Sequence, residues 1–291
     1  MAITAKTRLL GVIGDPIQHS LSPTMHNQAI TQLGLDWVYV AFPIASENLA
    51  IALDGFAAID LIGMSVTIPH KQAIMPLLTE ISDQAQAVGA VNTVWRSPQG
   101  WCGTNTDVDG FIAPLKELRG DWSGTTAVVL GCGGAARAVV AGCRLLGCDR
   151  VKVVARNADK LKAFCDSFQP PNPLAIALDP VLWSDLSSAL EGAELVVNTT
   201  PVGMHPHEDA SPLSDLQLGK LTFDAVVYDI IYTPRPTLLL KQAADRGLKT
   251  LDGLEMLVQQ GAIALEKWSG QSAPVDVMRQ ALLDWFAAKA S

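Results

Sequence analysis

The sequence predicts an α/β fold with two domains, each built on a mainly parallel β-sheet. Short runs rich in Val, Ile and Leu alternate with stretches of helical spacing along the whole chain. Continuous apolar runs of this kind are typical of parallel strands covered by helices on both faces. The strand–helix series restarts near Asp107, where a helical stretch leads into a new apolar run. A length of 291 residues is also sufficient for two domains of ordinary size.

The elements follow one another in the same alternation. The expected strands of the first half are RLLGVIG, WVYVAF and LIGMSVT, with helices at 23–33 and 46–57 between them. Those of the second half are TAVVL, VKVVA, ELVVN and AVVYDI, and the segment 254–288 is helical. We therefore expect one domain from residues 1–107 plus about 254–291, with the terminal helices packing back onto it, and a second from residues 108–253.

Composition excludes several classes of protein. Hydrophobic residues make up 49% of the chain and charged residues 17%, so a large core can form. The net charge of −8 argues against nucleic acid or an anionic membrane as a partner. No apolar run reaches the about 18 residues of a spanning helix, and no signal-peptide pattern precedes Asp15. Five cysteines without a CxxC pair argue against disulfides and a metal site, so we expect a cytoplasmic protein.

The stretch GDPIQHSLSPTMHN, Gly14 to Asn27, gathers short polar side chains where a strand gives way to a helix. Ser22 before Pro23 is typical of an N-cap followed by proline at the first helical position. Capping leaves Ser20 unexplained, because it lies two residues earlier. Two hydroxyls at this spacing can hold an anionic or polyhydroxylated ligand, so capping and ligand binding both remain open.

A dinucleotide-binding motif lies in TAVVLGCGGAARAVVAGC. Gly131, Gly133 and Ala136 match G-x-G-x-x-G/A between a predicted strand and a predicted helix. The first glycine permits the tight turn, the second permits close approach of the pyrophosphate, and the alanine permits close helix–strand packing. The helix N-terminus adds amide donors and positive potential. The alternative is a purely structural glycine-rich turn.

The end of the next strand indicates which dinucleotide is bound. An acidic residue there would bind the ribose hydroxyls of NAD, but this chain has Ala155, Arg156 and Asn157, with Lys160 one turn later. A guanidinium suits a 2′-phosphate, so NADP is favoured. The alternative is a solvated arginine at a helix start.

Three further stretches carry more polar groups than packing requires. SVTIPHK places Lys71 in a first helical turn, where the helix dipole disfavours its cationic form and so suits proton transfer. GAVNTV places Asn92 in a short apolar strand, and GTNTDVDG places Asp107 at a loop before a helix. An ordinary surface lysine and a simple N-cap are the alternatives for Lys71 and Asp107.

Together these stretches resemble the shikimate dehydrogenase family. The resemblance runs from Leu10 to about Ala264 and rests on the following motifs, in this order: GDPIQHSLSPTMHN, SVTIPHK, GAVNT, GTNTDVDG, GCGGAARA, NTTPVGM, YDIIYTPRPT and LDGLEMLVQQGA. It implies an N-terminal substrate-binding and catalytic domain and a Rossmann-type NADP-binding domain. It implies an oxidoreductase (EC 1.1.1.25) that reversibly reduces 3-dehydroshikimate to shikimate with NADPH, in the route to chorismate and the aromatic amino acids.

The resemblance also implies roles for individual residues. The catalytic pair falls on Lys71 and Asp107, with Lys71 as the proton donor oriented by Asp107. The substrate residues fall on Ser20, Ser22, Thr67, Asn92, Tyr232 and Gln260.

The cofactor residues implied in the same way lie in the glycine turn, after the second strand of that domain and at Ile230 and Gly253, and Asp83 takes a position where some members place an acidic residue near the nicotinamide. They fall on Gly131, Cys132, Gly133, Gly134, Ala135, Arg156, Lys160, Ile230, Gly253 and Asp83. One departure is Ala155-Arg156-Asn157, where the family often has Asn-Arg-Thr, and it puts one adenosine-side hydrogen bond in doubt.

For the substrate site, the resemblance implies that Ser20 and Ser22 donate to the ligand carboxylate and that Tyr232 adds a third donor. The spacing of the last helices favours Gln260 over Gln259, because Gln260 lies at the edge of the apolar stripe, where a polar tip needs a partner. A monomer or a homodimer is expected.

Three alternatives remain open. A quinate or dual quinate/shikimate dehydrogenase is disfavoured by Ser22 and Arg156, and a non-catalytic NADP or shikimate sensor by the intact Lys71 and Asp107. A folate-linked methylene dehydrogenase would not require the Ser20/Ser22 pair.

Overall fold

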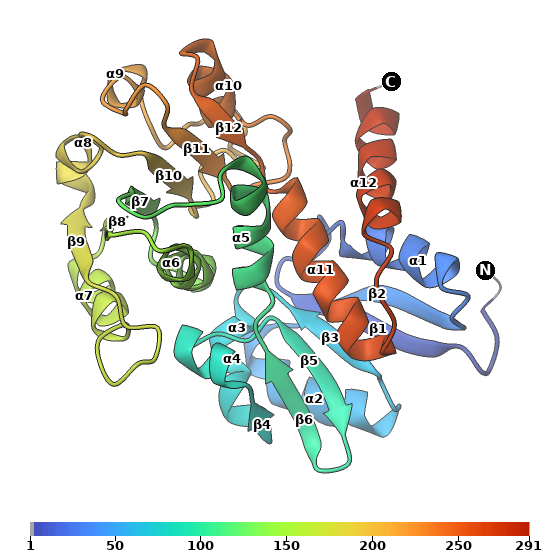
Figure 1. The fold of residues 1–291 in the computed structure, drawn as a ribbon. Helices are drawn as coiled ribbons and strands as arrows, with labels where there is room; N and C mark the ends of the chain where they lie inside the picture. Colours follow the sequence, from blue (N-terminus) through green and yellow to red (C-terminus); the bar gives the residue numbers. More distant parts are fainter. Residues whose placement is uncertain (1–2, 291) are drawn as a thin grey trace. The chain divides into compact units, whose positions relative to one another are not determined.

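The computed structural model describes residues 3–290, which divide into two compact units. One unit combines the chain up to Thr106 with the chain from Leu257 onward, and the other runs from Asp107 to Met256. The described part of each unit contains a six-stranded sheet with helices packed against it (Figure 1).

The first unit has a mixed sheet with the strand order β2-β1-β3-β5-β6-β4. β1 pairs in parallel with β2 and β3, and β4 pairs in parallel with β6, whereas β5 is antiparallel to β3 and β6. Its strands are β1 (Arg8–Gly14), β2 (Trp37–Pro43), β3 (Gly63–Val66), β4 (Glu80–Ile81), β5 (Thr93–Ser97) and β6 (Gly100–Thr104).

Helices cover this sheet, and the last helix of the chain, α12, packs against α1 (Figure 1). The expectation that the C-terminal helices pack back onto the first domain is therefore confirmed. The helices are α1 (Ser22–Gln32), α2 (Leu49–Ala58), α3 (His70–Ala73), α4 (Asp83–Val88), α11 (Leu254–Ser269) and α12 (Val275–Ala290), with short 3₁₀ turns η1 (Ser46–Asn48) and η2 (Met75–Leu77). The division between the units falls within the first turn of α11.

The β5–β6 hairpin of the first unit was not predicted from the sequence, which indicated only a short strand around Asn92. A tight connection joins the two strands, and Gly100 begins β6 with φ +140°, a conformation that side chains rarely adopt. A hairpin needs only such a short turn, whereas parallel strands need a crossover. The sheet is consequently mainly parallel with an antiparallel hairpin inserted, and not a run of parallel strands.

The second unit has an all-parallel sheet with the order β12-β11-β10-β7-β8-β9. This is the doubly wound order of dinucleotide-binding folds, with the switch point between β7 and β10. Its strands are β7 (Thr126–Leu130), β8 (Arg150–Ala155), β9 (Leu178–Leu182), β10 (Leu195–Asn198), β11 (Val226–Asp229) and β12 (Lys249–Leu251).

Helices alternate with these strands, as the apolar runs predicted. They are α5 (Asp107–Leu118), α6 (Gly134–Leu146), α7 (Ala158–Asp166), η3 (Trp183–Asp185), α8 (Leu186–Ala189), α9 (Asp215–Leu218) and α10 (Leu238–Asp245). The centre of the sheet is fully buried: Val128, Val154, Val196 and Val227 belong to one apolar cluster. Burial on both faces explains why these strands read as continuous runs of valine and leucine.

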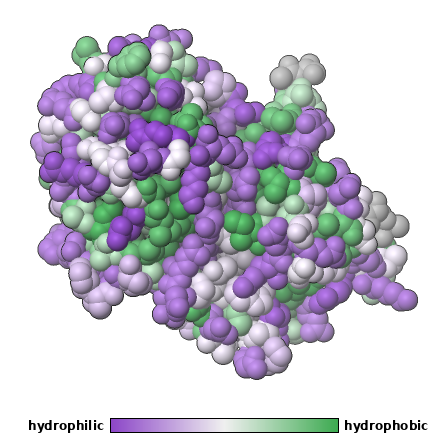
Figure 2. Space-filling view, in the orientation of Figure 1, coloured by the Kyte–Doolittle hydropathy of each residue, from purple (hydrophilic) through white to green (hydrophobic). Residues whose placement is uncertain are grey.

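The surface mixes hydrophobic patches with hydrophilic residues on both units, on the face shown in Figure 2. Among residues 3–290, no helix combines the length and the apolar character that a membrane crossing requires.

Candidate active site

The predicted substrate residues of the first unit follow the carboxyl ends of two adjacent parallel strands. Ser20 and Ser22 come after β1, and Thr67 and Lys71 come after β3. The backbone N–H of Thr67 donates to Ile13 O at 3.0 Å, which extends the pairing of these strands to their ends. Carboxyl ends of neighbouring parallel strands share one edge of a sheet, so the fold gathers these four residues there.

The start of α1 differs from the prediction that Ser22 is its N-cap. Ser22 is the first helical residue, Leu21 occupies the N-cap position, and no side chain caps the helix in the usual way. The Oγ of Ser20 instead accepts the backbone N–H of Ser22 at 3.3 Å. The prediction was wrong because the Leu21 carbonyl accepts the N–H groups of Thr24 and Met25, which a Ser22 cap would bind, and the buried Ser22 hydroxyl is left for other contacts.

A buried amide–hydroxyl network joins Asn92 to Gln260. The Nδ2 of Asn92 donates to Thr106 Oγ1 at 3.0 Å and to Gln260 Oε1 at 3.3 Å. Its Oδ1 accepts the backbone N–H of Thr106 at 2.8 Å and the hydroxyl of Thr93 at 3.0 Å. The hydroxyl of Thr106 in turn donates to Gln260 O at 3.0 Å. The structure thus brings together two predicted substrate residues that lie 168 positions apart.

Asn92 itself immediately precedes β5 and does not lie within the strand, contrary to the prediction. Its backbone still continues the sheet, because its carbonyl accepts the N–H of Val66 at 2.7 Å and its N–H donates to Thr104 O at 3.1 Å. The side-chain amide of Asn92 has hydroxyl and amide groups as its hydrogen-bond partners.

Lys71 is held next to this network by its backbone. It occupies the second position of α3, and its carbonyl accepts the N–H of Val91, the residue before Asn92, at 2.8 Å. The preceding His70 is fully buried, and its Nε2 lies 2.7 Å from Ile44 O. These contacts fix the start of α3 and leave the half-buried Lys71 at the same edge of the sheet as Thr67.

Sequence reasoning missed Thr93 and Thr106 as members of this site. Both are fully or nearly fully buried, and both bind the Asn92 amide. The available signal was that GAVNT and GTNTDVDG each place a threonine beside a predicted site residue, which is Asn92 in the first motif and Asp107 in the second. Asp107 follows Thr106 directly and is the first residue of α5, with 5% of its surface exposed. Its catalytic role stays a prediction.

Asp83 is placed differently from the other predicted site residues of the first unit. It is exposed at the first position of α4. The cap of that helix is Ser82, whose Oγ accepts the N–H of Ala85 at 3.2 Å. The role of Asp83 near a nicotinamide stays a prediction.

The glycine turn of the second unit has the geometry that a dinucleotide requires. Gly131 has φ +107°, and a Cβ there would lie 2.6 Å from Thr199 Oγ1, so glycine is needed. Gly133 is the N-cap of α6, and a Cβ on it would meet no heavy atom within 4 Å, so the backbone is open to a ligand. Ala136 is fully buried against the sheet. These features fit a pyrophosphate at the N-terminus of α6.

The residues predicted to read the 2′-phosphate follow β8. Arg156 is exposed, and among the described residues no ion pair engages its guanidinium. Asn157 caps α7 by accepting the N–H of Lys160 at 2.8 Å. Burial raises the pKa of the Cys132 thiol in the glycine turn, and the positive charge of Lys160 opposes this shift. No carboxylate occupies the end of β8, so the residues present fit a phosphate.

Gly253 and Ile230 lie against each other at the end of this sheet. A Cβ on Gly253 would lie 2.1 Å from Ile230 O, and its N–H donates to Ile231 O at 3.2 Å. Only glycine permits this approach of two backbone segments. The half-buried Tyr232 follows directly.

A buried carboxylate that sequence reasoning did not single out orders this segment. Asp229 ends β11 and accepts hydrogen bonds from Asn198 Nδ2 at 3.0 Å, Thr237 Oγ1 at 2.8 Å and the Ile231 N–H at 3.2 Å. Burial raises the pKa of Asp229 to about 6, although these hydrogen bonds oppose the shift. The motifs NTTPVGM and YDIIYTPRPT contain Asp229 and all three of these hydrogen-bond partners, so a polar residue ending a buried strand was the available signal.

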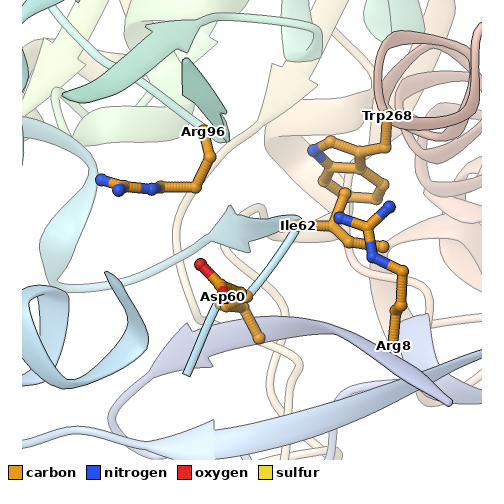
Figure 3. Close-up of a pocket in the computed structure, with 6 residues that line it drawn as sticks. Arg8, Asp60, Ile62, Arg96 and Trp268 are labelled. Carbon is orange, nitrogen blue, oxygen red and sulfur yellow. The ribbon is translucent and has the colours of Figure 1, made fainter. Parts of the chain in front are cut away.

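A cavity of about 460 Å³ in the first unit is not the predicted substrate site. Arg8 and Arg96 line it from two strands, with Asp60 between them (Figure 3). Arg8 begins β1, whereas Ser20 and Ser22 follow its other end. The cavity therefore opens at the opposite edge of the sheet.

Comparisons with known proteins agree with this arrangement. The model of the shikimate dehydrogenase substrate-binding domain matches residues 12–94, and that of the shikimate 5′-dehydrogenase C-terminal domain matches residues 253–283. A shikimate dehydrogenase (NADP⁺) of Synechocystis sp. is 57% identical over 97% of each chain. The chain belongs to the shikimate dehydrogenase family. The predicted family and fold class are thereby confirmed.

Solved structures of relatives extend over nearly the whole chain. Shikimate dehydrogenase from Thermus thermophilus, in complex with NADP(H) and shikimate, is 34% identical with a TM-score of 0.81, over 94% of this chain and 98% of that one. A quinate dehydrogenase from Corynebacterium glutamicum in complex with NAD is 31% identical with a TM-score of 0.85, over 96% and 99%. The fold alone does not separate the two activities, so substrate choice depends on particular side chains.

Proposed function

We propose that this chain is an NADP-dependent oxidoreductase that reversibly reduces 3-dehydroshikimate to shikimate (EC 1.1.1.25), in the route to chorismate and the aromatic amino acids. The observation that carries the proposal is the buried network of Asn92, Thr106 and Gln260 beside the backbone of Lys71. Buried amides at one edge of a sheet, next to a lysine, provide polar groups that can bind a ring with several hydroxyls and a ketone. The family membership supports the same reaction.

The substrate carboxylate is assigned to Ser20 and Ser22, with Tyr232 as a third donor. Hydroxyl donors give a charge-assisted hydrogen bond to a carboxylate without a net charge of their own. Thr67, Asn92 and Gln260 are assigned to the ring hydroxyls. Because amides both donate and accept, Asn92 and Gln260 can exchange a hydrogen bond of the buried network for one to a ring hydroxyl.

Lys71 is assigned as the general acid. Reduction of the ring ketone places negative charge on its oxygen, and the Lys71 ammonium supplies the proton that neutralises it. In the reverse direction, neutral Lys71 accepts the hydroxyl proton. Asp107 is proposed to orient the Lys71 amine through a hydrogen bond.

For the cofactor, the residues from Gly131 to Ala135 would hold the pyrophosphate, and Arg156 with Lys160 would hold the 2′-phosphate. Ile230 and Gly253 are also assigned to the cofactor, and Asp83 is assigned to a place near the nicotinamide. When bound, NADPH supplies the hydride for the reduction. The open backbone at Gly133 and the exposed guanidinium of Arg156 support these assignments.

The deciding experiment measures turnover with shikimate and quinate, each with NADP⁺ and NAD⁺. We expect kcat/KM for shikimate to exceed that for quinate by at least about 100-fold, because a site built to hydrogen-bond particular ring groups rejects ligands that leave them unpaired. Quinate carries its carboxylate on a tetrahedral carbon that also bears a hydroxyl, so it needs extra room beside the serines. Comparable efficiencies would favour a dual-specificity enzyme, and binding without turnover would favour a sensor.

We further propose that the protein acts in the cytoplasm, as a monomer or a homodimer. Five cysteines without a disulfide among the described residues support a reducing compartment. Sedimentation at micromolar concentration distinguishes the two oligomeric states, and cell fractionation tests the location.

A further inference from the structure

The carboxyl ends of β10 and β11 in the second unit are joined by two buried polar side chains. Asn198 ends β10, Asp229 ends β11, and the sheet register places them side by side. Each is 0% exposed, and Asn198 Nδ2 donates to Asp229 Oδ1 at 3.0 Å. Buried polar groups of this kind need partners for all of their donors and acceptors, so their remaining contacts show which segments they hold.

On the β10 side, the Asn198 amide fixes the loop that follows the strand. Its Oδ1 accepts the N–H of Thr200 at 3.0 Å and the hydroxyl of Thr200 at 2.7 Å, and its Nδ2 also donates to Val202 O at 3.3 Å. Thr199 in the same loop donates to Leu130 O through its N–H at 2.9 Å and its hydroxyl at 2.7 Å. Because Leu130 ends β7, the loop is tied to the strand that leads into the glycine turn.

On the β11 side, the Asp229 carboxylate fixes a second loop. Its Oδ1 accepts the N–H of Ile231 at 3.2 Å, and its Oδ2 accepts the hydroxyl of Thr237 at 2.8 Å. Thr237 is the N-cap of α10, and the Ile231 carbonyl accepts the N–H of Gly253 at 3.2 Å. An ionised carboxylate only accepts hydrogen bonds, and every group that faces this one can donate. The carboxylate therefore joins the end of β11 to the start of α10 and to the segment around Gly253.

The strand order places both loops beside the glycine turn, on the side away from Arg156. The relevant part of that order is β11-β10-β7-β8, with the glycine turn after β7 and Arg156 after β8. A dinucleotide in this fold extends across the carboxyl edge of the sheet through the switch point. With the adenosine half at β8 and the pyrophosphate at β7, the nicotinamide half belongs over the ends of β10 and β11.

We propose that Asp229 is a positioning residue that, together with Asn198, holds the loops after β10 and β11 in the shape that binds the nicotinamide half of NADP(H). The inference rests on the proposed function, because it requires a dinucleotide at this edge of the sheet. Asp229 is fully buried, so it acts through the loops that it holds. Loops that are ordered before the ligand arrives lose less conformational freedom on binding, which favours affinity.

The test compares the binding of two ligands by calorimetric titration. NADP⁺ occupies both halves of the expected site, whereas adenosine 2′,5′-bisphosphate carries the adenosine and the 2′-phosphate but no nicotinamide. For Asp229→Ala we expect the Kd of NADP⁺ to rise at least about 10-fold and that of the bisphosphate to change less than about 2-fold, because only the nicotinamide side loses its order. Titrations at about pH 8 keep the wild-type carboxylate ionised, since burial raises the pKa of Asp229 to about 6.

Asp224→Ala is the matched control, because the exposed Asp224 precedes the same strand at its opposite end. It should leave both dissociation constants unchanged. Asp229→Asn keeps the shape of the side chain and part of its hydrogen bonding, so it should lose less NADP⁺ affinity than Asp229→Ala. Equal losses for the two ligands in Asp229→Ala would indicate general damage to the cofactor site and would overturn the inference, as would an unchanged affinity for NADP⁺.

Thr237→Val decides the question if Asp229→Ala does not fold. It removes one donor to the carboxylate and keeps the shape of the side chain, so the Kd of NADP⁺ divided by that of the bisphosphate should rise about 3- to 10-fold. Thr222→Val is its control, because Thr222 precedes β11 and its hydroxyl donates to Ala193 O at 3.3 Å, away from the carboxyl edge. An unchanged ratio in Thr237→Val would overturn the inference.

These outcomes are distinguishable from failure of the proposed function. If the wild-type protein binds neither NADP⁺ nor the bisphosphate, the proposed cofactor site fails before any variant is compared. If the wild-type protein binds both and turns over shikimate, while Asp229→Ala binds both as tightly as the wild type, only the role of Asp229 fails.

Discussion

The two units of this chain carry their predicted functional residues in different ways. In the second unit, the glycine turn and the residues after β8 lie within about thirty positions of one another and act through backbone shape and exposed charge. In the first unit, the buried network of Asn92, Thr106 and Gln260 joins side chains up to 168 positions apart through hydrogen bonds. A local motif therefore suffices to find the site of the second unit, whereas the side chains of the first-unit network come together only once the chain has folded.

Lys71→Ala gives the largest expected effect and tests whether the first unit carries the proton-transfer chemistry. We expect kcat to fall about 10²- to 10⁴-fold, the usual range for the loss of a general acid, with shikimate affinity changed much less. Steady-state kinetics in both directions measure this. Lys267→Ala, another lysine of the first unit, should retain wild-type turnover. Near wild-type turnover of Lys71→Ala would remove the proton-transfer assignment.

The same contrast explains how much of the molecule the sequence could predict. The parallel strands of the second unit were recognisable because burial on both faces leaves uninterrupted apolar runs. The pairing of β5 and β6 into a hairpin was missed because each strand has only five residues and β6 carries two glycines, which weaken a strand pattern. Asn92 was singled out, but its partners Thr106 and Gln260 become neighbours only through long-range folding.

The start of α1 shows a second limit of sequence reasoning. Ser22 before Pro23 satisfies the rule for an N-cap, yet Ser20 accepts the backbone N–H of Ser22 instead. The N–H groups that a Ser22 cap would bind, those of Thr24 and Met25, are bonded to the Leu21 carbonyl, and this outcome depends on backbone dihedrals that the sequence does not display.

Arg156→Ala tests the charge that the second unit exposes after β8. We expect NADP⁺ affinity to fall about 10- to 100-fold, because a charge-assisted contact with phosphate is worth about 1.5–3 kcal/mol. NAD⁺ affinity should change little. Arg150 begins the same strand and pairs with Asp179 at 2.5 Å, so Arg150→Ala is the matched control and should leave both affinities unchanged. Equal losses for NADP⁺ and NAD⁺ would contradict the assignment of Arg156 to the 2′-phosphate.

Two alanine substitutions in the glycine turn separate backbone strain from ligand approach. Gly131→Ala should destabilise the protein by about 1–3 kcal/mol, because φ is +107° and the new Cβ would lie 2.6 Å from Thr199 Oγ1. Gly133→Ala should leave stability nearly unchanged, since its Cβ would meet open space. It should still weaken NADP⁺ binding, because the methyl group occupies the approach of the pyrophosphate. Urea unfolding and calorimetric titration measure the two effects, and equal stability of both variants would contradict the strain argument.

The smallest expected effect concerns pH, and it has opposite signs in the two units. The folded-state pKa of Asp229 is about 6, above its unfolded value, so its contribution to stability is full below about pH 4 and is lost as the pH rises through 6. The folded-state pKa of His26 is about 3, below its unfolded value, so its contribution is full above about pH 6.5 and is lost as the pH falls toward 3. Each group changes the free energy of unfolding by at most about 1.4 kcal/mol per pH unit.

Removing His26 or Asp229 should therefore change the slope of the unfolding free energy against pH in opposite directions. Between pH 4.5 and 5.5, neutral buried His26 makes the unfolding free energy of the wild-type protein rise with pH, and His26→Phe should lose this rise. Protonated buried Asp229 makes the unfolding free energy fall with pH, and Asp229→Asn should lose this fall. Unfolding free energies in urea at these two pH values measure both slopes, and His207→Phe, an exposed histidine, should keep the wild-type slope. Slopes that shift in the same direction for both variants would show that His26 or Asp229 does not hold the charge state that its burial imposes.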